Sequence, residues 1–348
     1  MKRQEIGHRF VLRICALVPL LLGWQPVFSH HSSAGIYDKE RLAEIEGTVV
    51  SAEWRNPHCT FVLRVIDESG ESLEWEIESG SVSTLRVRGL DREFLVVGDN
   101  VRVAGELALD GRPAMFARNM LLQNGREVLL TAESDPFWPE GLRGELLEPD
   151  FDEVVADRAR SMADGIFRVW SADLDPFVPM FRADEFPLTA AAQQARERWD
   201  PLTSPFLGCE QKSLPLIMGG AYPIEFLRAG ENILLRLEEF DTERLIHMTD
   251  AAPSQSFRSR MGYSTGYLEQ KTLVVETTNL DLHPFFFDGT PRSSQATLVE
   301  RFTVGETGDN LFYTALAGDL EAFSEPLELS RYWLWRPEIQ VQPFDCIE

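Results

Sequence analysis

The charge balance of this 348-residue chain limits the partners that it can bind. Acidic residues outnumber basic ones by 56 to 33, which gives a formal net charge of -23 at pH 7, whereas nucleic acids and anionic membranes bind to basic surfaces. With 44% hydrophobic and 26% charged residues, the composition excludes a mainly disordered chain, and the length predicts about two domains.

Residues 1–29 have the pattern of a cleavable signal peptide. Basic residues at positions 2, 3, 9 and 13 come before an almost wholly apolar run over residues 14–22, and small or β-branched residues lead to Ser29, where a signal peptidase would cut. The run is too short for a permanent transmembrane helix, and an uncleaved anchor is the alternative. We therefore expect a periplasmic or secreted protein without membrane contact after signal cleavage.

Residues 30–130 are expected to form a small OB-like β domain. Residues 81–88 predict a short helix that stops at Gly89. Five alternating or β-branched segments predict strands, over residues 44–54, 59–66, 72–78, 100–107 and 114–122. Three strands, a helix and two further strands form the order of a small OB-type barrel.

The motifs of this domain carry a family resemblance. They include the His30-His31-Ser32 start, the Trp54-Arg55-Asn56-Pro57-His58 turn and glycines at positions 47, 89, 98 and 105. In these residues the segment resembles a widespread family of uncharacterised exported bacterial domains, which begin with paired histidines after a signal peptide. The resemblance implies a secreted OB-like domain and brings no activity with it.

The same histidines are candidate metal ligands. Cleavage after Ser29 would make His30 the first residue, so that a free amine and the imidazoles of His30, His31 and His58 could converge. Such a set suits Cu(II), and then Zn(II) or Ni(II), and it resembles the histidine brace of copper monooxygenases. In the structural alternative, Pro57 fixes a turn in which His58 bonds to the backbone.

Residues 131–160 are expected to form a linker and a helix, followed by a larger β domain over residues 161–348. Residues 164–170 predict its opening strand, and residues 188–199 predict a helix that Thr189 caps. Eight further short runs predict strands, over residues 223–228, 233–240, 243–248, 262–269, 272–278, 296–304, 310–316 and 327–334. This regular spacing favours an antiparallel lipocalin-like barrel, closed or half-open, with a sandwich as the alternative.

Three cysteines follow the predicted signal peptide. We expect Cys209 and Cys346 to form a disulfide, because both lie in the second domain and an exported protein meets oxidising conditions. Cys59 would then be a free, buried thiol that acts as a small apolar filler.

The second domain also resembles a known family of uncharacterised exported bacterial proteins. The resemblance lies in Cys209, Cys346, residues 215–218 and 222–225, the Met261-Gly262 pair with Ser264 and Gly266, and residues 272–278 and 300–302. Relatives commonly carry His after Met-Gly and Trp after the later Gly, where this chain has Tyr263 and Tyr267. If that His is catalytic in the relatives, this chain lacks the activity.

Six polar residues are candidates for a ligand pocket in the barrel: Glu225, Asp250, Tyr263, Glu276, Glu300 and Arg301. Adjacent residues of a strand point to opposite faces, so only one of Glu300 and Arg301 can lie inside. For each of the six, a solvated position or a structural salt bridge is the alternative.

Three hypotheses about function follow. The first is a periplasmic ligand-binding protein of unknown specificity that holds a small, partly apolar ligand in the C-terminal barrel. The second is a copper-binding or copper-redox protein that uses the mature N-terminal His with His58, with copper as the candidate cofactor. The third is an enzyme of unknown class, although the sequence has no nucleophile elbow, phosphate-binding loop or dinucleotide-binding fingerprint.

Overall fold

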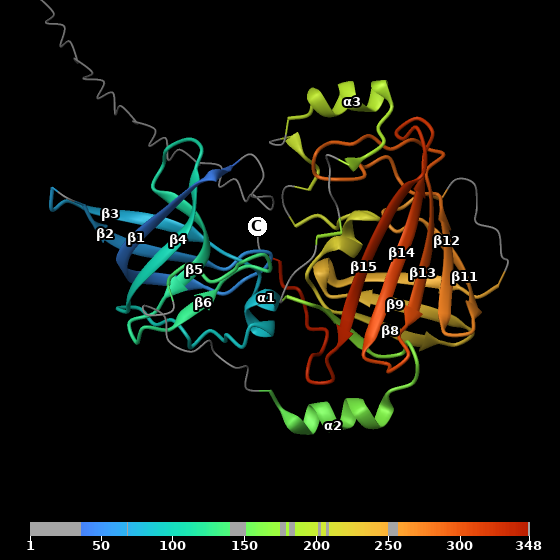
Figure 1. Cartoon of the computed structure of the whole chain (residues 1–348), viewed down its shortest axis with the longest axis horizontal. Helices are drawn as coiled ribbons and strands as arrows, with labels where there is room; N and C mark the ends of the chain where they lie inside the picture. Colours follow the sequence, from blue (N-terminus) through green and yellow to red (C-terminus); the bar gives the residue numbers. More distant parts are fainter. Residues whose placement is uncertain are drawn as a thin grey trace, which may run out of the picture.

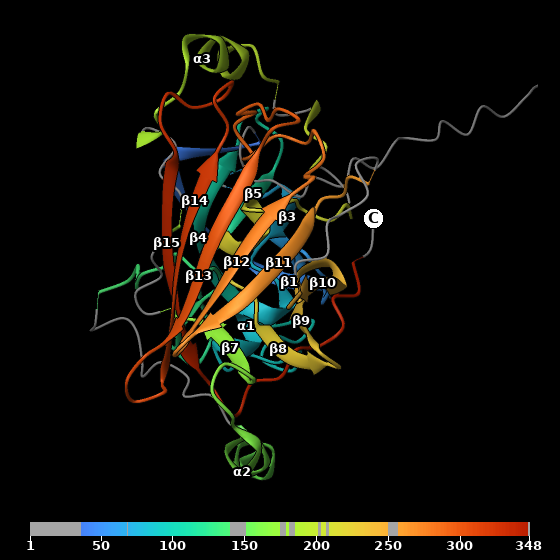
Figure 2. The same ribbon diagram turned by 90° about the vertical axis from the view of Figure 1, so that its right-hand side faces the viewer.

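The computed structural model describes residues 36–67, 69–139, 151–174, 179–180, 185–200, 203–206, 209–249 and 257–346. These residues form two β-barrels side by side, with α2 (Glu153–Met162) and α3 (Ala190–Glu197) at opposite ends of the second barrel (Figure 1, Figure 2). The predicted signal peptide, His30, His31 and Asp250 lie outside the described residues. None of the helices in the described part is long and apolar enough to cross a membrane.

The first barrel confirms the predicted OB-like topology. β1 pairs antiparallel with β2 and β4, β2 pairs with β3 and β4 with β5, and β3 and β5 lie parallel. The ring therefore closes in the order β1-β2-β3-β5-β4-β1, a five-stranded Greek-key barrel of the OB type. Its elements are β1 (Tyr37–Glu53), β2 (Thr60–Ile66), β3 (Ser72–Glu78), α1 (Val82–Val87), β4 (Asn100–Ala108), β5 (Ala114–Leu121) and β6 (Glu127–Leu129).

Two features of this barrel differ from the sequence prediction. β1 begins at Tyr37 and not at residue 44, because its charged first part pairs with the end of β4 across a register shift between Asp38 and Leu42. The shift breaks the alternation from which a strand is recognised. β6 was not expected, since three residues are too few to show a period.

The short helix α1 begins and ends where the sequence predicts. The Ser81 side chain accepts a hydrogen bond from Thr84 N at 3.0 Å and so caps the first turn. Gly89, with φ of 79°, turns the chain away in a conformation that favours glycine. Leu85 and Val87 are buried, which fixes the helix between the two barrels.

The second barrel is a closed ring of nine strands, so the half-open and sandwich alternatives are excluded. The ring runs in the order β10-β11-β12-β13-β14-β15-β7-β8-β9, and β9 pairs with β10 to close it. The strands are β7 (Val169–Ala172), β8 (Ile224–Ala229), β9 (Asn232–Leu237), β10 (Thr242–His247), β11 (Tyr263–Glu269), β12 (Thr272–Thr278), β13 (Thr297–Val304), β14 (Asn310–Gly318) and β15 (Leu327–Trp335).

The barrel is not wholly antiparallel, which corrects one part of the prediction. β10 and β11 run parallel and pair through Ile246↔Ser264 and His247↔Thr265. Parallel neighbours need a long connection, and residues 248–262 separate these two strands in the sequence. The opening strand also starts later than expected, because Gly165, with φ of 56°, belongs to a turn closed by Asp164 and Phe167.

Aromatic side chains fill the middle of the second barrel. Phe226 contacts Phe302, Phe302 contacts Tyr313, and Tyr313 contacts Trp333, with ring centres 5.2, 5.0 and 5.6 Å apart. All four side chains are buried. A lipocalin keeps this space for its ligand, whereas these four side chains occupy it in the present barrel.

The two barrels are joined by polar contacts around α1 and the C-terminal tail, which lies between them (Figure 1). The buried Asn56 donates to Phe344 O at 2.5 Å, and its side-chain oxygen accepts from Val82 N at 3.1 Å. Arg86 pairs with the buried Glu238 at 3.0 Å. The Trp-x-Asn-Pro-His turn therefore connects α1 to the end of the other domain.

The predicted disulfide between Cys209 and Cys346 is present, with Cα atoms 5.7 Å apart. It fixes the tail that contacts Asn56 to the body of the second barrel. Cys59 is a free, buried thiol, and burial raises its pKa to about 12, which leaves it as an unreactive filler.

Candidate functional site

The structure brings two of the six predicted ligand residues to one place. Glu300 points into the second barrel, and Tyr263 lies beside a cleft in the barrel wall. The exposed Glu276 lies on the outer surface, as does Arg301, which pairs with Glu269 at 2.7 Å. Glu225 is half-buried and pairs with Arg236 at 3.5 Å, and Asp250 is not among the described residues.

Glu300 belongs to a buried polar network built on Arg244. Arg244 Nη1 donates to Glu300 Oε1 at 3.0 Å, and Nη2 donates to Glu300 Oε2. Nε donates to Ser264 Oγ at 2.9 Å and Nη2 to Thr277 Oγ1 at 2.7 Å, while the Tyr313 hydroxyl donates to Glu300 Oε1 at 3.0 Å. Because β10 to β14 each supply one inward residue, the network ties five strands together.

The network is close to electrically neutral and almost saturated. Arg244 and Glu300 have side-chain exposures of 1% and 0%, and such a pair is tolerated in a barrel core only when its hydrogen bonds are made. Burial and the nearby Glu300 carboxylate raise the pKa of Tyr313 well above its usual value. Within the described part of the chain, four of the five guanidinium N–H groups donate, which leaves one on Nη1.

A cleft of about 470 Å³ opens beside this network, and we call it the seam cleft. It lies where β10 and β11 diverge from their short parallel pairing, so the wall of the barrel is incomplete there. Of the described residues, ten line it: Glu243, Arg244, Leu245, His247, Phe257, Ser259, Met261, Gly262, Tyr263 and Ser264. A cleft with a polar floor and apolar walls is typical of small-molecule sites.

A ring pair forms one wall of the seam cleft. His247 and Tyr263 stack with ring centres 4.6 Å apart and planes 17° from parallel. Gly262 sets this geometry, since its φ is 61° and a Cβ there would collide with Thr278 O. The Met-Gly-Tyr sequence therefore places the tyrosine ring at the cleft.

Sequence reasoning missed Arg244 and His247. Thr242, Arg244 and Ile246 form the inward face of β10, so strand alternation alone places a charge inside the barrel and offers a signal for Arg244. Its partner Glu300 lies 56 residues further on, and only the closed ring brings the two strands near each other.

In the first barrel, His58 is fixed by its surroundings. Its Nδ1–H donates to Ser79 O at 2.7 Å, and its Nε2 lies 3.5 Å from Glu78 Oε1. Tyr37 also donates to Glu78, at 2.8 Å. The backbone bond expected in the structural alternative is therefore made. Among the residues that the structure covers, no three His, Cys, Asp or Glu side chains are grouped to hold a metal ion.

Fold and site together define a two-barrel protein, with an OB-like domain and a closed nine-stranded barrel that carries a cleft in its wall. The model of a family of unknown function, DUF6152, matches residues 20–115. The match includes both histidine motifs and most of the OB-like barrel, and it is consistent with an N-terminal domain of unknown function. A search of curated proteins finds no match to the chain.

Replacing Glu300 with Gln should destabilise the fold by about 3–5 kcal/mol, because Arg244 would remain buried without its counter-charge. The matched control is Glu269→Gln, which breaks the exposed pair with Arg301 and should cost less than about 1 kcal/mol. Urea unfolding followed by tryptophan fluorescence measures both changes. Equal costs for the two variants would show that the buried pair has no special structural role.

Stability should fall at alkaline pH through the buried tyrosines. The pKa values of Tyr222 and Tyr313 are raised well above the usual value of 10.0 by burial. The folded chain keeps these protons while the unfolded chain releases them, so the free energy of unfolding decreases as pH rises above about 10.

Urea unfolding at neutral pH and above pH 10 tests this. Tyr313→Phe should show a smaller alkaline loss than the wild-type chain, and the exposed Tyr267→Phe should show the wild-type loss. The interpretation is wrong if Tyr313→Phe and Tyr267→Phe lose the same stability between the two conditions.

Proposed function

We propose that this chain is an exported binding protein that holds a small, uncharged, partly apolar ligand in the seam cleft. The observation that carries the proposal is the combination of a stacked ring wall with a neutralised polar floor. His247 and Tyr263 offer ring surface, and Phe257 and Met261 add apolar contact area. Aromatic surface of this kind contributes strongly to the burial of small ligands.

The floor of the cleft argues for an uncharged ligand. Glu300 neutralises Arg244, so an anion gains little, and Glu243 at the cleft disfavours an anion further. The one Arg244 N–H without an acceptor among the described contacts is suited to a carbonyl or hydroxyl oxygen. A flat compound with one such oxygen would match both wall and floor.

Membership of residues 160–348 in the second family of exported proteins is part of the same proposal. Its support is that the resembling residues have structural roles here: Cys209 and Cys346 are bonded, and Gly262 shapes the cleft. Tyr263 stands where relatives commonly carry His. Its phenol ring stacks on His247 and gives the cleft a ring surface that suits the holding of a ligand.

A panel of uncharged aromatic and alicyclic carbonyl compounds and alcohols tests the proposal by ligand-observed NMR on the mature protein. Tyr263→Ala should weaken binding about tenfold or more, because the ring wall is lost. Tyr267→Ala is the matched control, since this exposed tyrosine lies on the same strand away from the cleft. No binding across the panel, or equal effects of the two variants, would refute it.

A second candidate function is Cu(II) binding at the start of the first barrel. The observation that favours it is the hydrogen bond of His58 Nδ1–H to Ser79 O, which orients the ring and leaves Nε2, 3.5 Å from Glu78 Oε1, as the nitrogen that could bind an ion. Metal-ligating histidines commonly have this arrangement. His58, with the amine and imidazole of His30 and the imidazole of His31, would hold the ion.

Calorimetry with Cu(II) alone, on protein whose first residue has been sequenced, tests this candidate. His58→Ala should weaken binding about tenfold or more, whereas His283→Ala should leave it unchanged, since His283 bonds to Asp281 in the other barrel. A first residue other than His30, or equal Cu(II) affinity in both variants, would exclude the histidine site.

A further inference from the structure

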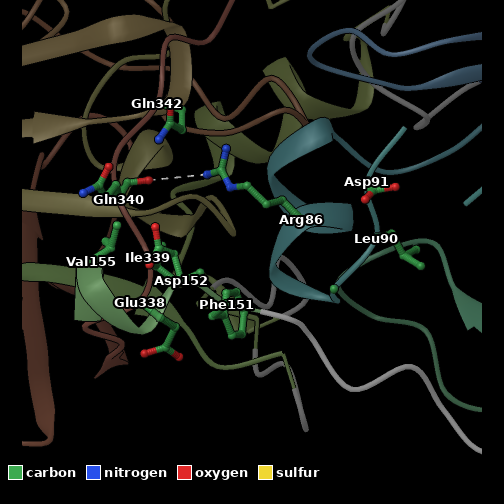
Figure 3. A pocket seen from close by; sticks show the side chains of 11 residues that line it. Arg86, Leu90, Asp91, Phe151, Asp152, Val155, Glu338, Ile339, Gln340 and Gln342 are labelled. Atoms are coloured by element: carbon green, nitrogen blue, oxygen red, sulfur yellow. Dashed lines mark hydrogen bonds between the residues drawn. The ribbon is translucent and has the colours of Figure 1, made fainter. Parts of the chain in front are cut away.

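A second pocket lies at the boundary between the two barrels, away from the seam cleft. It encloses about 290 Å³ between the end of α1, the start of α2 and the C-terminal tail (Figure 3). We call it the boundary pocket and define it by Arg86, Leu90, Asp91, Phe151, Val155, Ile339, Gln340 and Gln342. Boundaries between domains are common places for ligand sites.

The floor of the boundary pocket is apolar. Leu90 and Ile339 are buried, with 3% exposure each, and Phe151 and Val155 are half-buried beside them. The Arg336 guanidinium lies 5.4 Å from the centre of the Phe151 ring, which holds the ring in place. A ligand with a face of C–H groups would cover this surface.

The rim of the pocket offers hydrogen bonds, while most of its charge is cancelled. Arg86 is paired with Glu238, and its Nη2 also donates to Gln340 O at 3.5 Å. Figure 3 draws the bond to Gln340 as a dashed line. Glu338 is paired with Arg336, and Asp152 accepts from Val154 N at 2.9 Å to cap α2.

The exposed amides of Gln340 and Gln342 remain for a ligand among the described contacts, whereas Asp91 Oδ1 accepts from Glu93 N at 2.7 Å. Each amide provides two N–H donors and one acceptor oxygen. An anion would be repelled by Asp91 and Asp152 and would find Arg86 already engaged. The rim therefore fits a neutral molecule that both donates and accepts several hydrogen bonds.

We infer that the boundary pocket binds a small polyhydroxylated molecule, a monosaccharide or a polyol of similar size. The C–H face of such a ring would pack on Phe151, Val155 and Ile339. Its hydroxyl groups would exchange hydrogen bonds with Gln340 and Gln342. Because the lining comes from both barrels, a bound molecule would also hold them together.

Saturation-transfer NMR of the full mature chain with glucose, galactose, arabinose, xylose and glycerol tests the inference. Removing both amides in Gln340→Ala/Gln342→Ala should weaken binding about tenfold, as expected for the loss of two neutral hydrogen bonds. Gln295→Ala is the matched control, because Gln295 is an exposed glutamine on the loop before β13, outside this pocket.

Thermal unfolding gives a second measurement. The bound sugar should raise the unfolding temperature of the wild-type chain and of Gln295→Ala, and should raise that of the double variant less. The inference is overturned if none of the five compounds gives saturation transfer, or if the double variant, folded by circular dichroism, binds as tightly as the control. Tyr263→Ala should leave sugar binding intact, so failure at this pocket and failure at the seam cleft are distinguishable.

Discussion

The buried pair of Arg244 and Glu300 is the interaction on which the second barrel depends. At the seam, β10 and β11 share few backbone hydrogen bonds, and the guanidinium spans the gap by bonding to Ser264, Thr277 and Glu300. A closed ring can therefore contain an opening without losing its shape. The wall is left incomplete at this seam, where side chains replace part of the ladder.

Much of this architecture could be predicted from the sequence, because it depends on local signals. Strand alternation predicted the positions of most strands of both barrels, and Ser81 and Gly89 predicted the two ends of the helix between them. The disulfide followed from counting cysteines in the second domain. In each case the information lies within a few residues or in composition.

The candidate site was harder to predict from the sequence, because it depends on which strands become neighbours. The parallel pairing of β10 with β11 leaves no trace in the pattern of either strand, and it creates the cleft. In the sequence, Arg244 looks like any other charged residue of a strand. Its role becomes visible only when the fold brings Glu300 within hydrogen-bonding distance. Alternation along β12 and β13 divides their residues into two faces. It cannot say which face points outward, so the outward position of Arg301 and Glu276 needed the structure.

The path of the C-terminal tail has a consequence for both barrels. Asn56 belongs to the first barrel, but its side-chain amide donates to the backbone oxygen of Phe344, near the end of the described chain. In the same way, Cys209 forms its disulfide with Cys346. Neither barrel has these contacts until residues 344–346 are in place. Residues 344–346 therefore complete both halves, the first through one backbone carbonyl and the second through one sulfur.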